Sequence, residues 1–272
     1  MLDTPFSTYQ RSRGTARVRL GAEGEVRGLY QSGSAKALIP RTHGSQPEVV
    51  FLNTSGGLTG GDRLDFALDV AGGGTAMAST QTAERAYASP GGTPARVQVE
   101  LRIGEGSTLY WLPQETILFE HASLDRVTDV HLADGARFVG IETIVLGRAH
   151  MGETLGTLAF TDKRRIWDLA LRPIHSEHIA IDSGVLAHRN RPATLAGGTV
   201  FCTLTYIASD AEDRIAAVRA AIAGAGNRLA ASAWDNRLVL RAIGDDAWRT
   251  RAAILPALRL LTGGAIPRVW QL

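Results

Sequence analysis

The 272-residue chain contains 44% hydrophobic and 21% charged residues, a balance typical of globular rather than disordered proteins. Its 29 basic and 27 acidic residues leave a net charge of +2, which argues against a dedicated nucleic-acid or membrane surface. Cys202 is the single cysteine, so an intrachain disulfide and a paired-cysteine metal or redox site are both excluded.

The first segment, residues 1–14, is expected to be a disordered tail. It carries Asp3 and no apolar stretch of the kind that a secretory signal requires. No run in the whole sequence approaches the ~18 apolar residues of a transmembrane helix. The cytoplasm is therefore the expected compartment.

A glycine-rich loop at residues 53–63 is the most informative local feature. The apolar run 49–52 precedes it and the alternating run 64–70 follows it, which predicts strand, glycine turn and strand. A phosphate-binding loop would need Gly-Lys-Ser/Thr and a following helix, and both are missing. The loop is expected to present Asp62; the simpler alternative is a tight hairpin with an incidental acid. Its glycines are Gly56, Gly57, Gly60 and Gly61.

Up to about residue 207 the hydrophobic pattern has a period of two. Residues 96–103 and 128–132 alternate between polar and apolar side chains, and residues 199–207 are rich in β-branched and aromatic types. Glycine-rich turn signals separate these runs. Short strands at such spacing predict an all-β body of the sandwich or barrel-like kind.

Two amphipathic helices are expected late in the chain, at residues 210–223 and 246–261. Gly224 and Gly263 are suited to end them, and Pro256 is expected to kink the second one or to start a new turn. No linker or repeat is visible. The prediction is one mainly β domain over residues 1–272, whose part 209–264 carries the helices.

Glu142 lies in the apolar run 138–146. On a strand it would share a face with Phe138, Ile144 and Leu146, and an unpaired buried carboxylate costs several kcal/mol. It must therefore be paired, with Arg148 as a candidate partner, or protonated, or solvated by an internal water channel. Glu142 is a candidate either for a structural ion pair or for the lining of a polar passage.

His175 and His178 are weaker candidate metal ligands. Pro173 and the preceding alternation predict strand and loop rather than a helical face, and the zinc-protease helix motif is absent. Trp270 is the candidate for a partner-facing residue, because ordered chain ends are usually docked on something.

Four sequence blocks, in order, resemble the urease accessory protein UreD (also called UreH) family, over roughly residues 15–272. They are the glycine loop ending in Asp62, the Leu-Pro-x-Glu block with Pro113 and Glu115, the stretch 140–153 with Arg148, and the ending 266–270. A Thr-Gln block begins at Thr80. It departs from the family pattern over residues 84–89, which read E-R-A-Y-A-S.

The resemblance implies a β-helical or sandwich-like body, with an internal passage proposed to conduct nickel, lined here by Asp62, Thr80 and Glu142. It implies a non-enzymatic scaffold and metallochaperone that binds apo-urease and the F-type accessory protein, through which the G-type GTPase is recruited. It also implies that no cofactor is tightly bound and that nickel is carried only transiently. Carboxylate, imidazole and carbonyl ligands suit Ni²⁺, and weak ligands suit passage.

Two alternatives stay open from the residues. One is a β-rich hydrolase that uses a pair of carboxylates such as Glu115 and Glu142, which would have to face one cleft. The other is a pure adaptor, in which the glycine loop shapes a binding surface and no metal passes.

Overall fold

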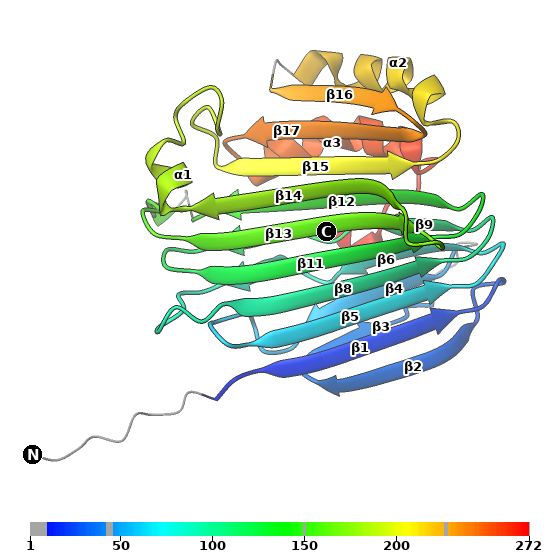
Figure 1. Cartoon of the computed structure of the whole chain (residues 1–272), viewed down its shortest axis with the longest axis horizontal. Coiled ribbons are helices and arrows are strands. Elements are labelled where there is room, and N and C mark those ends of the chain that lie inside the picture. Colours follow the sequence, from blue (N-terminus) through cyan, green and yellow to red (C-terminus); the bar gives the residue numbers. More distant parts are fainter. Residues whose placement is uncertain (1–9, 42–45, 149–150, 226–227, 272) are drawn as a thin grey trace, which may run out of the picture.

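We describe the protein from a computed structural model, which defines residues 10–41, 46–148, 151–225 and 228–271. Two β-sheets face each other and two helices cover the far side of the larger sheet (Figure 1). The seven-stranded sheet has the order β14(Pro173–Asp182), β13(Ala159–Asp168), β11(Ser123–Leu132), β8(Ala95–Ile103), β5(Arg63–Val70), β1(Arg13–Leu20) and β2(Val26–Gly33).

The ten-stranded sheet completes the layer behind. Its main path is β16(Leu229–Trp234), β17(Arg237–Gly244), β15(Val200–Ile207), β12(Arg137–Leu146), β9(Thr108–Trp111), β6(Thr75–Thr80), β4(Glu48–Asn53) and β3(Ala35–Leu38). Beside this path, β10(Thr116–Leu118) pairs with both β12 and β7(Glu84–Ala86).

The chain passes back and forth between the sheets, so most neighbouring strands are parallel. In the seven-stranded sheet β5 pairs with β8, β8 with β11 and β11 with β13, all in parallel, while the intervening strands β6, β9 and β12 stack in the other sheet. This is a solenoid-like body of two sheets. The prediction of a mainly β protein, β-helical or sandwich-like, is confirmed.

The period-two pattern explains why each strand buries one face. In β5 the side chains of Leu64 and Leu68 are fully buried, whereas Asp65 and Asp69 alternate with them on the outer face. The same alternation runs through β1, β8 and β11, so their apolar residues join in one core between the two sheets.

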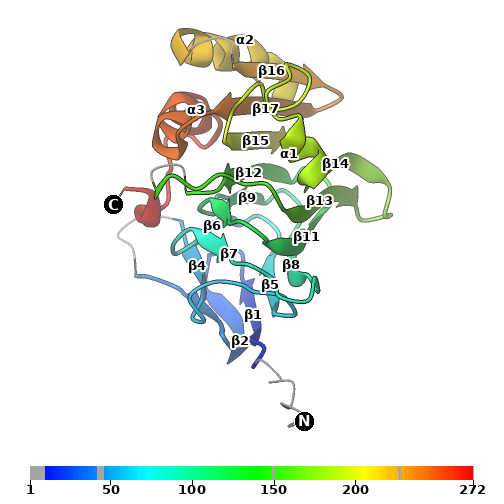
Figure 2. The same ribbon diagram turned by 90° about the vertical axis from the view of Figure 1, so that its left-hand side faces the viewer.

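A second core lies on the other side of the ten-stranded sheet. There α2(Ala211–Ile222) and α3(Ala247–Leu261) pack on β12, β15, β16 and β17 (Figure 2). The expectation of two late helices is confirmed. The structure adds a short third helix, α1(Ser183–Ala187). Asp182 caps its N-terminus and accepts a 2.8 Å hydrogen bond from the Val185 amide.

The ends of α3 follow its sequence signals. Asp246 caps the N-terminus by accepting a 2.8 Å hydrogen bond from the Arg249 amide, and Gly263, at φ +63°, follows the last turn. The helix runs through Pro256 as one element. In the described part of the chain, none of the helices has the length and apolar character needed to span a membrane.

Of the expected tail over residues 1–14, positions 13 and 14 belong to β1, and positions 1–9 lie outside the described residues. The backbone amide of Ser12 is already fixed, since it donates a 2.7 Å hydrogen bond to Asp62.

Candidate functional site

A chain of charged side chains crosses the interior where β11 and β13 face β12. Its centre is Arg126 on β11, which is 7% exposed. Its Nε and Nη2 donate to the two carboxylate oxygens of Asp162 at 3.0 and 2.8 Å, and its Nη1 lies 2.8 Å from Glu142 Oε2. Nη1 also donates to the Thr116 hydroxyl at 3.0 Å. One guanidinium therefore binds two buried carboxylates at once.

Glu142 forms the inner end of this chain. It is 5% exposed, and its Oε1 accepts a 3.0 Å hydrogen bond from the Trp111 indole. The prediction that Glu142 is buried is confirmed, but Arg148 as its partner is wrong. Arg148 lies near the surface, where it pairs with Glu153 at 3.0 Å and stacks 4.6 Å from the Phe119 ring.

The chain continues from Asp162 towards the surface. Arg164 binds Asp162 through Nε at 2.8 Å and Glu177 through Nη1 at 3.0 Å. Glu177 in turn accepts hydrogen bonds from Nε and Nη2 of Arg241 on β17, at 3.1 and 2.8 Å. Strand register supports this order, because Arg126 lies beside Asp162 and Arg164 beside Glu177 in the parallel and antiparallel ladders. We call the series Glu142–Arg126–Asp162–Arg164–Glu177–Arg241 the ion-pair chain.

Asp162 shows what these contacts do to a buried acid. Burial alone raises the pKa of the Asp162 carboxyl, but the guanidiniums of Arg126 and Arg164 outweigh it and hold that pKa well below its usual range. The carboxylate is fully buried and charged because two cations bind it.

A small cavity of about 30 Å³ lies against this chain, enough for roughly one water molecule or a small ion. Glu142, Arg164 and Glu177 line it, together with buried side chains whose polar atoms have no hydrogen-bond partner among the described residues: Thr128 Oγ1, His175 Nε2 and Thr203 Oγ1. Unpaired buried polar atoms are costly, so this cavity is suited to a polar guest.

The two candidate histidines lie on opposite faces of β14. His175 is 8% exposed and points into the cavity, where burial lowers the pKa of its imidazole. His178 is exposed on the opposite face of β14. Among the described residues, no group of three His, Cys, Asp or Glu side chains is arranged to hold a metal ion, so the cavity provides only scattered ligands.

Asp62 is buried at the glycine loop, but both of its oxygens are occupied. They accept hydrogen bonds from the amides of Ser12 at 2.7 Å and Thr59 at 2.8 Å. The nearby Thr80 hydroxyl accepts a 2.9 Å hydrogen bond from the Gln114 amide. In this arrangement Asp62 fastens the loop to the start of β1.

The glycine loop itself connects the two sheets. It leads from β4 in one sheet to β5 in the other, so strand, turn and strand is right and the hairpin alternative is wrong. Gly57 adopts φ +147°, and a Cβ there would come within 2.4 Å of the Tyr87 ring and 2.8 Å of the Arg85 carbonyl. Glycine is required for this close approach to β7.

Glu84, beside this loop, is an acid that the sequence did not single out. It lines a cavity of about 50 Å³ with Phe51, Phe66 and Thr80, and it accepts 3.3 Å hydrogen bonds from the Asn53 amide. Burial raises the pKa of Glu84 to about 7.

The other sequence candidates lie elsewhere. Pro113 is in the connection between β9 and β10, and Glu115 pairs with Arg251 of α3 beside an open groove of about 450 Å³. Glu142 lines the internal cavity instead. In the described structure Glu115 and Glu142 therefore line different cavities, so this pair does not form the single cleft that the hydrolase alternative requires of it.

Trp270 lies in the short helical turn η3(Arg268–Trp270) and docks on its own chain. Its indole donates a 3.0 Å hydrogen bond to the Leu112 carbonyl, and Arg251 stacks 4.7 Å from its ring. A role of Trp270 towards a partner stays a prediction.

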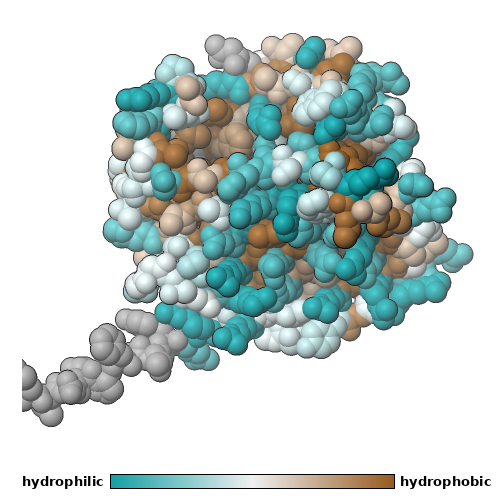
Figure 3. Space-filling model, viewed as in Figure 1, coloured by the Kyte–Doolittle hydropathy of each residue, from teal (hydrophilic) through white to brown (hydrophobic). Residues whose placement is uncertain are grey.

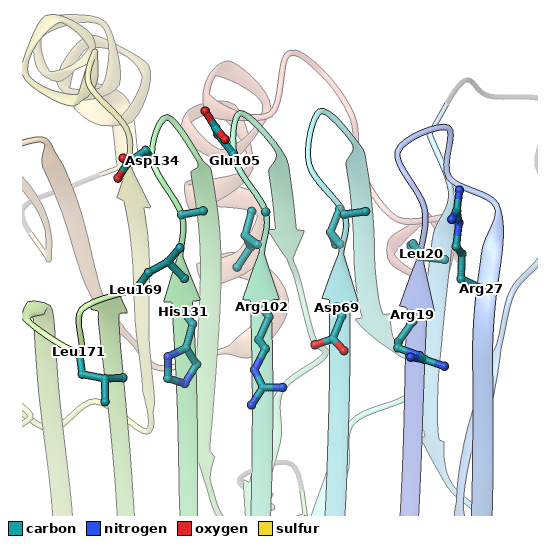
Figure 4. Close-up of a pocket in the computed structure, with 15 residues that line it drawn as sticks. Arg19, Leu20, Arg27, Asp69, Arg102, Glu105, His131, Asp134, Leu169 and Leu171 are labelled. Carbon is teal, nitrogen blue, oxygen red and sulfur yellow. The ribbon is translucent and has the colours of Figure 1, made fainter.

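A hollow of about 930 Å³ is on the outer face of the seven-stranded sheet, which is mostly hydrophilic (Figure 3). A row of in-register side chains crosses it, from neighbouring strands: Arg19, Asp69, Arg102 and His131 (Figure 4). Leu169 and Leu171 border the row and are 70% and 66% exposed. The charges that line this hollow are mixed, so it selects no ligand class.

Comparison with known proteins identifies the family of the chain. The family model described as UreD urease accessory protein matches residues 12–271. A urease accessory protein UreD of Cereibacter sphaeroides is 47% identical, covering 99% of this chain and 98% of the relative. Proteins of the same name are 48% identical in a Jannaschia species, over the full length of both chains, and 47% identical in Paracoccus denitrificans, over 96% of this chain and 93% of the relative. The chain belongs to the urease accessory protein UreD family.

Proposed function

We propose that this protein is a non-enzymatic scaffold that binds apo-urease and helps Ni²⁺ reach the urease active site through the cavity beside Glu142. The observation that carries the proposal is a buried cavity lined by two carboxylates, an imidazole and two hydroxyls, in which the imidazole and both hydroxyls have polar atoms without a hydrogen-bond partner among the described residues. These are ligand types that Ni²⁺ accepts and exchanges. No cofactor resides in the protein under this proposal, and nickel is its transient cargo.

The partners follow from the same proposal. The chain would bind apo-urease directly and the F-type accessory protein beside it, which brings the nickel-delivering G-type GTPase into one cytoplasmic complex. Exposed aromatic and methionine side chains support a docking role, because both are enriched at protein–protein interfaces. Trp248 and Met151, which are 69% and 76% exposed, border the groove at the start of α3.

The residues differ in the part they would take. Glu142 and His175 would offer replaceable ligands inside the cavity, with Thr128 and Thr203 as weaker oxygen ligands. Asp62 and Thr80, whose polar atoms are occupied by backbone amides, would hold the glycine loop in place. The charges of the ion-pair chain balance, so a dication would enter only where a guanidinium moves away.

A matched pair of substitutions tests the proposal. Glu142→Gln and Asp162→Asn each remove one carboxylate from Arg126, but only Glu142 lines the cavity. Urease would be produced with each variant, and its nickel content and activity measured together with the amount of intact accessory complex. We expect nickel content to fall with Glu142→Gln while the complex persists, and to fall less with Asp162→Asn.

Two outcomes would count against the passage. Equal losses in both variants would mean that the ion-pair chain is needed only for the fold. Full nickel loading with Glu142→Gln and an intact complex would favour the pure adaptor, in which the protein joins its partners and no metal crosses it.

A further inference from the structure

We propose that Arg241 is the gate of this cavity: bound to Glu177 it closes the surface end of the ion-pair chain, and released into water it admits a divalent cation that exchanges its water ligands for side chains of the cavity. The inference rests on the proposed function, since it assigns the entrance or exit of the same passage. Arg241 acts here through Glu177, so it is a positioning residue.

The exposed fractions of the side chains identify which end of the ion-pair chain lies at the surface. The side chain of Asp162 is 0% exposed, Arg164 is 11%, Glu177 is 8% and Arg241 is 51%. At the other end, Arg126 and Glu142 are 8% and 6% exposed. The ion-pair chain therefore reaches solvent at Arg241, where β14 faces β17.

Arg241 is also the guanidinium of the chain that is held least firmly. Arg126 is bound between Glu142 and Asp162, and Arg164 between Asp162 and Glu177. Within the ion-pair chain, Arg241 binds Glu177 alone, through a single carboxylate oxygen. Exposed ion pairs are weak and compete with water, so Arg241 is the first guanidinium that thermal motion releases.

β14, the strand that carries Glu177, makes few other contacts with the ten-stranded sheet. In the described residues β14 is an edge strand, paired only with β13. Two side chains of β17 bridge the gap to it: Arg241 binds Glu177, and Arg237 donates through Nη1 to the Ile174 carbonyl. The seam between the sheets is thus closed by side chains rather than by a backbone ladder.

Release of Arg241 creates a site with the right chemistry for a cation. With Arg241 in place, three carboxylates face three guanidiniums and the ion-pair chain is neutral. Without it the chain carries one net negative charge, located near Glu177. His175 lies two residues earlier on the same inward face of β14 and has an unpaired Nε2. A carboxylate and an imidazole then face the seam together, a pair that binds borderline divalent cations.

The gate can be tested without nickel, by measuring how fast a small neutral reagent enters the cavity. Thr203→Cys places a thiol on the cavity wall, in the full-length chain, and methyl methanethiosulfonate labelling is followed by mass spectrometry. The natural Cys202 is a suitable silent background, because it is fully buried on the other face of β15 and burial raises the pKa of its thiol to about 12.

Arg241→Gln is compared with Arg214→Gln in this background. Arg214 is a matched control: it is 45% exposed and ion-paired with Asp210 at 2.9 Å, on α2 and outside the ion-pair chain. Position 203 lies directly across from Arg241 in the β15–β17 ladder, and loss of a cation raises the pKa of a neighbouring thiol, so each labelling rate is divided by the thiolate fraction taken from its pH profile. Since an exposed ion pair contributes up to about 1 kcal/mol, Arg241→Gln should speed this corrected labelling of Cys at position 203 roughly 2- to 5-fold. Arg214→Gln should leave the rate unchanged.

Labelling that is no faster in Arg241→Gln than in Arg214→Gln overturns the gate, whatever the nickel data show. Faster labelling supports it, and nickel loading of urease then tests the passage separately. If Arg241→Gln opens the cavity while Glu142→Gln leaves nickel loading intact, the gate stands and the passage of nickel fails.

Discussion

The N-terminal coils (β1 and β4 to β8) and the C-terminal coils (β11 to β15) differ at one inward register position of the seven-stranded sheet. In the N-terminal coils this position holds the fully buried Leu64, which packs in the hydrophobic core. In the C-terminal coils the residues in register with it are Arg126 and Asp162, joined by two hydrogen bonds, whereas the residues in register with Leu68 stay apolar, Val130 and Ile166. Both regions have parallel strand pairing in the seven-stranded sheet. The inward side chains, and not the backbone, therefore decide whether the interior is apolar or polar.

The two regions also treat a buried acid in opposite ways. In the C-terminal coils burial of Asp162 is overcome by two guanidiniums, and its pKa is lowered. In the N-terminal coils Glu84 has amide donors as its main partners, and burial raises its pKa to about 7. The guanidiniums of Arg126 and Arg164 thus keep Asp162 charged, whereas burial brings the pKa of Glu84 close to neutrality.

The largest effect is expected from removing the central cation. Arg126→Met leaves Glu142 and Asp162 without their shared guanidinium, and breaking a buried ion pair costs about 3–5 kcal/mol of unfolding free energy. Urea unfolding of the full chain measures it. Leu68→Ala in the N-terminal coils should cost about 3 kcal/mol through the cavity it leaves, yet keep nickel loading per folded molecule. A loss below about 1 kcal/mol for Arg126→Met would show that the ion-pair chain is dispensable for stability.

A pH-dependent effect of intermediate size is expected at Glu84. Burial raises the pKa of Glu84 to about 7 in the folded chain, from an ordinary value of 4.5, so the folded state binds the proton more tightly. Stability is therefore highest below the unfolded pKa and falls as pH rises from about 4.5 to 7, by up to about 3 kcal/mol. Glu84→Gln should remove this slope and should gain stability relative to the natural chain at pH 8. Parallel slopes for the two proteins between pH 5 and 8 would contradict the assignment.

The smallest effect is expected from a single cavity hydroxyl. Thr203 is buried with an unpaired Oγ1, so Thr203→Val should raise the unfolding free energy by about 1 kcal/mol while lowering nickel transfer. Thr262→Val is the control, because that buried hydroxyl donates a 3.0 Å hydrogen bond to the Leu258 carbonyl and its loss should cost about 1 kcal/mol. Destabilisation by both substitutions would mean that Thr203 has a partner after all.

Strand content and the late helices could be predicted because both follow from local periods. The burial of Glu142 was equally predictable, since it interrupts an apolar face of its own strand. Its partner was not, because Arg126 comes from another sheet and only the crossing of the chain between sheets brings the two together. A usable signal was nevertheless present: Arg126 and Asp162 occupy inward parity positions, between Leu124 and Thr128 and between Phe160 and Arg164.

The hydrogen-bond partners of Asp62 could not be predicted from the sequence. The sequence shows a carboxylate after a glycine loop, but not that the Ser12 and Thr59 amides would occupy its two oxygens. Both donors are backbone amides, and the identity of the side chain at a position does not indicate which acceptor its amide will bind. Candidate ligands on loops are therefore less predictable than charged residues that break a strand pattern.

Glu48 at the start of β4 accepts a 3.1 Å hydrogen bond from the Arg268 amide, 220 positions further along the chain. A solenoid can be laid down coil by coil during synthesis, each coil stacking on the one before it. This contact breaks that order, because an acid buried in the first coils waits for residues 268–270 to leave the ribosome. Until then β4 carries a carboxylate that lacks this hydrogen bond, so the last residues of the chain complete the packing of one of its first strands.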